Sequence, residues 1–221
     1  ANGTGPPGPP GPAGTSLRYA TVVVAAADSL HPEDADFVCD GVDDHLTIAD
    51  ALAANGEYGT VLLMDGTYQI AGPIGSMSYQ QTLQGMASTH LDCSGFTAAD
   101  NGQPWPGGSD AVLWVYGSAY DPAPTVRDIY WSGVAGAPFL AIEGNDCVIS
   151  GCSFSANELA GNDDVAIALS SGANVSIVNN VFTSGGVWDQ WSDSTLLDGN
   201  GFYYRSEEHT SELQSRFGIS Y

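Results

Sequence analysis

One apolar pattern recurs in the second half of the chain, where residues 147–155 are CVISGCSFS, residues 175–183 are VSIVNNVFT and residues 195–202 are TLLDGNGF. Alignment of these segments places equivalent apolar residues 28 and then 20 positions apart: Ile149, Ile177 and Leu197 in one column, and Phe154, Phe182 and Phe202 in another. Variation in length falls in stretches rich in Gly, Asn and Ser. This combination is typical of stacked coils, in which strands align and insertions go to loops.

The alignment extends to further residues. Ile129 lies 20 positions before Ile149 and is expected to join its column, and Asn180 and Asn200 occupy matching positions. Stacked asparagines can satisfy one another's amides and the backbone of a turn, so both are interpreted as structural. The repeats predict an all-β fold, a right-handed parallel β-helix formed as a single-stranded solenoid. A β-sandwich, which also has short strands at regular spacing, is the alternative, although sandwiches do not usually repeat an internal motif.

The N-terminal half predicts how this stack begins. Residues 19–27, YATVVVAAA, are rich in β-branched side chains and predict a strand. Residues 40–56, DGVDDHLTIADALAANG, predict one short amphipathic helix that Asp43 or Asp44 caps at its N-terminus. The apolar positions at helical spacing are Leu46, Ala49, Leu52 and Ala53. We therefore expect a capping segment over residues 19–59, followed by rungs over residues 60–204.

Both ends of the chain differ from this body. Residues 5–16 are GPPGPPGPAGTS, with Gly at every third position, and predict a collagen-like stub over residues 1–18; a flexible Pro/Gly linker is the alternative. Residues 205–221, RSEEHTSELQSRFGISY, resemble the in-frame translation of a short-read sequencing adapter. That resemblance implies a non-native tail, with a natural amphipathic tail as the alternative, and we expect the native chain to continue beyond Tyr204.

The charge of the chain limits its partners. Four Lys and Arg residues stand against 26 Asp and Glu residues, which gives a formal net charge of −22. A surface this negative cannot neutralise phosphates, so nucleic acid and anionic membranes are poor partners. No apolar run reaches the roughly 18 residues that a bilayer-spanning helix needs, so no membrane insertion is expected.

The cysteines and acidic clusters do not predict a cofactor. Cysteines occur at positions 39, 93, 147 and 152 without metal-binding spacing, so we interpret them as small buried hydrophobic residues and predict no metal. The acidic clusters at residues 40–44 and 163–164 contain the oxygen ligands that calcium prefers, but neither has the spacing of a calcium loop.

Four segments carry a resemblance to a known family: ATVVVAAADS at 20–29, DFVCDGVDDHLTIADALAA at 36–54, GTVLLMDGTYQIAGPI at 59–74 and TLQGMASTHLDCSG at 82–95. They resemble the N-terminal part of pectate-lyase-like β-helix proteins, in particular tail fibres and tailspikes of actinobacterial phages. The resemblance implies a homotrimeric fibre on the virion that serves as a shaft and binds a bacterial surface polysaccharide. The alternatives are a depolymerase, a glycoside hydrolase or lyase whose active site lies mostly beyond the truncation, and an extracellular bacterial adhesin.

Catalytic candidates are few. Asp163 and Asp164, in GNDDVAI, resemble the paired acids of polygalacturonases, and Asp146 or Glu143 would lie one coil earlier. The Gly-His-Gly and Arg-Ile-Lys motifs of those enzymes are absent from the sequence, which favours an ordinary acidic turn. For elimination from a uronate, Arg127 could offset the charge of the sugar; the alternative is an arginine that pairs with a neighbouring acid such as Asp128.

Aromatic residues predict a binding surface. The segment WDQWSD holds Trp188, Asp189, Trp191 and Asp193 in one Gly-flanked stretch. Indole rings stack on sugar faces while carboxylates accept hydrogen bonds from hydroxyls, so these four residues are the carbohydrate-binding candidates. Packing in a core or an interface is the alternative role for the tryptophans.

Overall fold

The computed structural model describes residues 21–77, 80–96, 110–117, 123–133, 137–155, 165–171, 174–189 and 195–203. The collagen-like stub and the adapter-like tail expected at the two ends of the chain lie outside the described residues.

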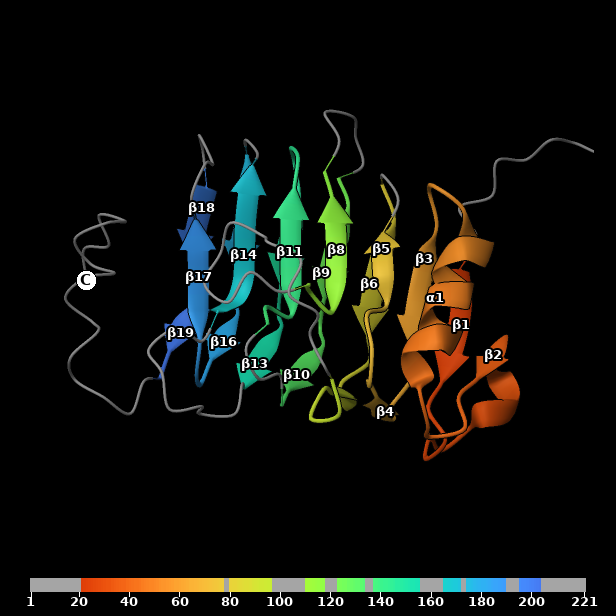
Figure 1. The fold of residues 1–221 in the computed structure, drawn as a ribbon. Helices are drawn as coiled ribbons and strands as arrows, with labels where there is room; N and C mark the ends of the chain where they lie inside the picture. The colour runs from red at the N-terminus through yellow and green to blue at the C-terminus, as the bar shows by residue number, and fades with distance from the viewer. Residues whose placement is uncertain are drawn as a thin grey trace, which may run out of the picture.

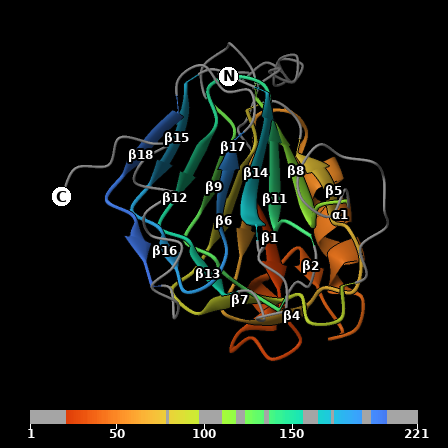
Figure 2. The ribbon, with the colours of Figure 1, turned by 60° about the vertical axis from the view of Figure 1, so that its left-hand side comes forward.

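The described chain passes in turn through three parallel sheets, so that from β3 onward strands three apart in the sequence become neighbours (Figures 1 and 2). The eight-stranded sheet contains β1 (Thr21–Ala25), β2 (Phe37–Val38), β3 (Thr60–Leu63), β6 (Thr82–Gly85), β9 (Thr125–Arg127), β12 (Val148–Ser150), β15 (Val175–Val178) and β18 (Thr195–Asp198). The six-stranded sheet contains β4 (Gly66–Gln69), β7 (Thr89–Asp92), β10 (Tyr130–Ser132), β13 (Ser153–Ser155), β16 (Val181–Phe182) and β19 (Gly201–Phe202). The five-stranded sheet contains β5 (Gly75–Met77), β8 (Leu113–Tyr116), β11 (Leu140–Glu143), β14 (Val165–Ser171) and β17 (Gly186–Asp189).

Every strand pairing within these ranges is parallel, which is the arrangement that stacked coils require and that a β-sandwich lacks. The strands alternate between buried and partly exposed residues, because successive side chains of a strand point to opposite faces. The chain is therefore mostly β with parallel sheets, and the buried half of each strand faces one shared interior.

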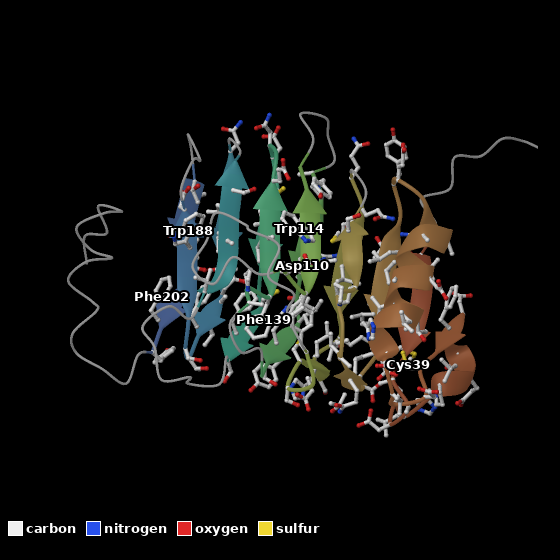
Figure 3. The ribbon with its side chains drawn as sticks, viewed as in Figure 1. Cys39, Asp110, Trp114, Phe139, Trp188 and Phe202 are labelled. Atoms are coloured by element: carbon white, nitrogen blue, oxygen red, sulfur yellow. The ribbon has the colours of Figure 1, made fainter. Side chains whose placement is uncertain are left out.

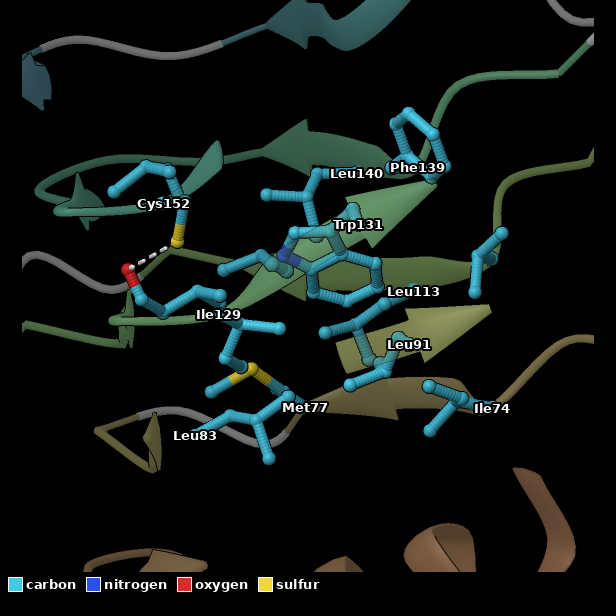
Figure 4. Close-up of a cluster of buried hydrophobic side chains, with 14 of the residues drawn as sticks. Ile74, Met77, Leu83, Leu91, Leu113, Ile129, Trp131, Phe139, Leu140 and Cys152 are labelled. Carbon is cyan, nitrogen blue, oxygen red and sulfur yellow. Dashed lines mark hydrogen bonds between the residues drawn. The ribbon is translucent and has the colours of Figure 1, made fainter. Parts of the chain in front are cut away.

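In-register pairing stacks interior residues of successive coils. In the eight-stranded sheet Ile149 pairs with Ile177 and Ile177 with Leu197, so this part of the predicted column is confirmed. The aromatic column of the six-stranded sheet is confirmed as well. Ring centroids are 5.0 Å apart for Phe154 and Phe182, and 4.9 Å apart for Phe182 and Phe202, the ring in the last described coil (Figure 3). Trp131 precedes them and packs among buried aliphatic side chains (Figure 4).

The predicted place of Ile129 in the first column is wrong. Val126 pairs with Ile149, whereas Ile129 lies in the corner between β9 and β10, next to Leu83 and Met77 in Figure 4. Ile129 is buried, so its apolar character has a structural reason, but its equivalent in the next coil is Cys152. The spacing of 20 residues between Ile129 and Ile149 equals that between Ile177 and Leu197 only by coincidence. The residue equivalent to Ile149 is Val126, which lies 23 positions before it.

From β3 onward, each strand of the eight-stranded sheet is followed by a turn into the six-stranded sheet, here called the first corner, and this turn has a regular backbone. Its first residue has a positive φ in four successive coils, at Asp128, Gly151, Asn179 and Gly199. Asp, Asn and Gly are the residues that tolerate this region best. The Asp and Asn side chains lie over the next glycine, where an added Cβ would overlap them. The glycines are therefore required for close approach as well as for φ.

Asn180 and Asn200, the second residues of two of these corners, form a ladder of hydrogen bonds. The Cys152 amide donates to Asn180 Oδ1 at 2.9 Å, and the Asn180 amide donates to Asn200 Oδ1 at 2.9 Å. Asn180 Nδ2 donates to the Ile149 carbonyl and Asn200 Nδ2 to the Ile177 carbonyl. Each side chain thus replaces the backbone partners that a corner interrupts.

The single α-helix of the described residues is α1 (Asp44–Asn55), and η1 (Pro32–Asp34) is a short 3₁₀ turn. In Figures 1 and 2, α1 lies beside β5, at the N-terminal end of the five-stranded sheet. Its buried apolar face is formed by Ile48, Ala51 and Leu52. The predicted face is therefore mostly wrong: Leu52 is buried, but Leu46 and Ala53 are exposed and Ala49 is half-buried.

The N-terminus of α1 is not capped in the way that the sequence predicts. Asp43 precedes the helix with a φ of 52° and makes no side-chain capping bond. Asp44 is completely buried, and its carboxylate accepts hydrogen bonds from the backbone amides of Gly41 at 3.0 Å and Gln69 at 2.8 Å. Asp44 therefore attaches the helix to β4 rather than capping its own first turn.

The ladder generates a stability prediction. Asn180→Ala leaves the Cys152 amide and the Ile149 carbonyl without their side-chain partners in a buried corner, and should lower the free energy of unfolding by about 2–3 kcal/mol. Asn200→Ala, at a half-buried position in the next coil, should cost less. Urea denaturation of both variants measures the difference, and equal losses would contradict the ladder as the cause.

Burial also makes the four cysteines inert. All four are free and buried, and burial raises the pKa of the Cys39, Cys147 and Cys152 thiols from 9.0 to about 12, and that of Cys93 well above 9.0. Only the thiolate reacts. Because the pKa of each thiol is higher in the folded than in the unfolded protein, burial of the neutral thiols stabilises the fold fully below pH 9.0. This stabilisation disappears as the pH rises toward 12.

We therefore expect no reaction with an aromatic disulfide reagent at pH 8 in the native state, and four equivalents of reaction in denaturant. Native-state labelling followed by mass spectrometry checks this. Rapid native labelling of any of the four would show that its thiol is accessible.

Candidate functional site

The outer surface of the five-stranded sheet carries a row of residues in register. Trp114 pairs with Ala141, Ala141 with Ala168, and Ala168 with Trp188. The residues on both sides of the first three, and Val187 before Trp188, belong to the buried interior, so by alternation this row points outward. Figure 3 shows Trp114 and Trp188 on the same side of the stack. We call Trp114, Ala141, Ala168 and Trp188 the tryptophan face.

This face is apolar, whereas the outside of a coil is ordinarily polar. Ala141 and Ala168 are completely buried together with Ala111, and Trp114 and Trp188 are partly buried against them. Trp114 and Trp188 are thus the partly exposed members of a small apolar cluster outside the coil interior.

Trp114 is held in position by residues close to it in the sequence. Its indole Nε1–H donates to Asp110 Oδ1 at 2.7 Å, and the same oxygen accepts the Ala111 amide at 2.9 Å. Tyr116, two residues along β8, stacks on Trp114 with ring centroids 6.1 Å apart and an interplanar angle of 14°. Trp114 thus presents a ring whose orientation is fixed before any ligand arrives.

Trp188 and Asp189 are the parts of the predicted WDQWSD site that the structure describes. Both lie in β17, and Asp189 Oδ2 accepts a hydrogen bond from the Thr195 hydroxyl at 3.2 Å. Trp191 and Asp193 lie outside the described residues. Trp188 shares its outward row with Trp114, and Ala141 and Ala168 lie between them.

The catalytic candidates are distributed over several elements. Glu143 is exposed at the end of β11, where it pairs in register with Tyr116, and Asp146 lies in the following turn with a φ of 56°. Arg127 lies on a different sheet, on β9, and its Nη2 donates to Gln84 Oε1 at 2.7 Å. The predicted alternative, in which Arg127 pairs with a neighbouring acid such as Asp128, is therefore wrong, because Arg127 bonds the side chain of Gln84.

Asp163 and Asp164 lie outside the described residues. Within the described ranges, no three His, Cys, Asp or Glu side chains gather as a metal site requires. No helix in this part of the chain is long and apolar enough to cross a bilayer.

A groove of about 360 Å³ lies on the outside of the six-stranded sheet and its first corners. It is lined by Met86, Ser88, His90, Asp128, Tyr130 and Ser153, among others. The rings of His90 and Tyr130, which pair in register on β7 and β10, stack with centroids 4.6 Å apart and an interplanar angle of 22°. His90 Nε2 and the Ser132 hydroxyl are hydrogen-bonded at 2.8 Å.

Sequence reasoning missed Trp114 and the groove for different reasons. The alternation in LWVY, residues 113–116, could have indicated an outward Trp114, but pairing it with Trp188 required the lengths of three coils. The groove depends on the shape of a corner, for which the sequence offered no signal.

Comparison of the chain with protein-family models, with curated proteins and with solved structures gives no match in any of the three.

Proposed function

We propose that the chain is part of an extracellular fibre of the phage-tail type, which binds a bacterial surface polysaccharide on the tryptophan face. The observation that carries the proposal is the pair of partly exposed, in-register indoles with carboxylates close by in the sequence, Asp110 beside Trp114 and Asp189 beside Trp188. Sugars combine apolar ring faces with hydroxyl donors, and aromatic rings with acceptor oxygens complement both.

The spacing of the two indoles suits an extended chain rather than a single sugar. Trp114 and Trp188 are three strand steps apart, which corresponds to about 14 Å along the stack. A ligand that touches both rings must therefore be an oligosaccharide lying along the coil axis.

We infer a right-handed parallel β-helix, because connections between parallel strands of one sheet are right-handed in about 98% of cases. The collagen-like triplets support a homotrimer, because that helix winds three chains. The strongly acidic surface of this chain repels polyanions, and a rigid shaft with such a surface suits exposure on a virion.

The test is binding to an array of bacterial surface polysaccharides. Trp188→Ala and Trp114→Ala should each weaken binding about ten-fold, because each removes a stacking surface worth roughly 1–1.5 kcal/mol. Trp188→Phe should retain most of the affinity, since it keeps an aromatic face.

Leu196→Ala is the matched control, because Leu196 is exposed on the outside of the eight-stranded sheet and should not touch the ligand. Thermal unfolding of each variant separates lost binding from lost structure. If both alanine variants are folded and bind as tightly as the parent chain, the tryptophan face is not the binding surface.

A further inference from the structure

The groove on the six-stranded sheet exists because one first corner is longer than the others. Five of the six first corners contain two residues, whereas the corner between β6 and β7 contains three, Met86, Ala87 and Ser88. The additional residue makes this corner project beyond its neighbours. The space beside it, above Asp128 and Gly151 of the next two coils, is the groove.

The wide corner is rigid. The Thr89 amide donates to the Met86 carbonyl at 3.0 Å, and the Met86 amide donates to Thr89 Oγ1 at 2.7 Å. The Thr89 hydroxyl also lies within hydrogen-bond distance of the Leu63 and Met64 carbonyls, at 3.0 and 2.9 Å. This buried threonine fixes the corner to the preceding coil, so one wall of the groove is formed before a ligand binds.

Tyr130 provides the other wall. Its side chain is 40% exposed, and its ring is supported by the stacked His90 imidazole, which is itself anchored to Ser132. A partly exposed ring held in one orientation is a stacking platform of the kind that aromatic side chains offer to flat or apolar ligand faces.

Polar groups converge on the same space. Asp128 is exposed, with its carboxylate held over Gly151, and hydroxyls of Ser88 and Ser153 also line the groove. Among the described residues that line the groove, Asp128 is the one acidic residue, and none is Lys or Arg. An anionic ligand would therefore meet repulsion, whereas a ligand with several hydroxyl donors would be accepted.

We propose that this groove binds a single uncharged sugar ring, which stacks on Tyr130 and donates hydroxyl hydrogen bonds to Asp128. Its volume lies at the lower end of the range of small-molecule sites, which suits one ring. The site is on a different sheet from the tryptophan face and does not depend on the function proposed for that face. It would give the shaft a second carbohydrate contact.

The experiment is a titration of the isotope-labelled full chain with the methyl glycosides of glucose, galactose and mannose, monitored by backbone amide shifts. At least one glycoside should give saturable shifts at residues 86–90 and 128–130, with a dissociation constant on the order of 1–10 mM. Tyr130→Ala should weaken binding at least ten-fold, whereas Tyr130→Phe should keep it within about two-fold.

Two controls keep the result specific. Trp188→Ala should leave these shifts unchanged, which separates the groove from the tryptophan face, and urea denaturation should show that Tyr130→Ala is folded. The absence of saturable shifts with all three glycosides, or unchanged binding by folded Tyr130→Ala, would overturn the proposal. Equal binding of methyl glucuronide would overturn the assignment of an uncharged ligand.

Discussion

The structure depends on the fact that no coil can bury its interior face alone. Each coil contributes a few apolar side chains from three short strands, and these become buried because the same positions of the coils on either side contact them. Parallel, in-register pairing is what brings like positions together. The interior is therefore a set of columns, such as Phe154, Phe182 and Phe202, rather than a core assembled from unrelated elements.

The same in-register pairing determines which residues are neighbours on the outer surface. Once Leu113 and Val115 are fixed in the interior, Trp114 must point outward, and its neighbours along the sheet must be Ala141 and then Ala168. Surface rows are thus as regular as interior columns, although nothing in the packing dictates their chemistry. In the row that contains Trp114 and Trp188, the two alanines are completely buried and the two tryptophans pack against them, so the outside of the five-stranded sheet holds a second apolar cluster.

The sequence predicted most where repeats are local and least where contacts are distant. The columns through Ile177 and Phe182 followed from spacing, whereas Ile129 was misplaced because a corner residue and a strand residue can have the same spacing. The exposed side of α1 was misjudged at Leu46 because an alanine-rich helix has a weakly amphipathic pattern. Asp44 bonds the amide of Gln69, 25 residues away, which no local rule for helix caps could reveal. Trp188 was singled out from its local motif, whereas its place in one row with Trp114 followed only from the register of three coils.

The uneven length of the coils has a consequence for how such a chain can change. Equivalent residues Val61, Leu83, Val126, Ile149, Ile177 and Leu197 are separated by 22, 43, 23, 28 and 20 positions, while the first corner keeps two residues in five coils out of six. Length differences are absorbed almost entirely at the other two edges of the stack. Segments of different length are accommodated there while the columns stay in register, so the chain of each coil can vary at these edges independently of the scaffold.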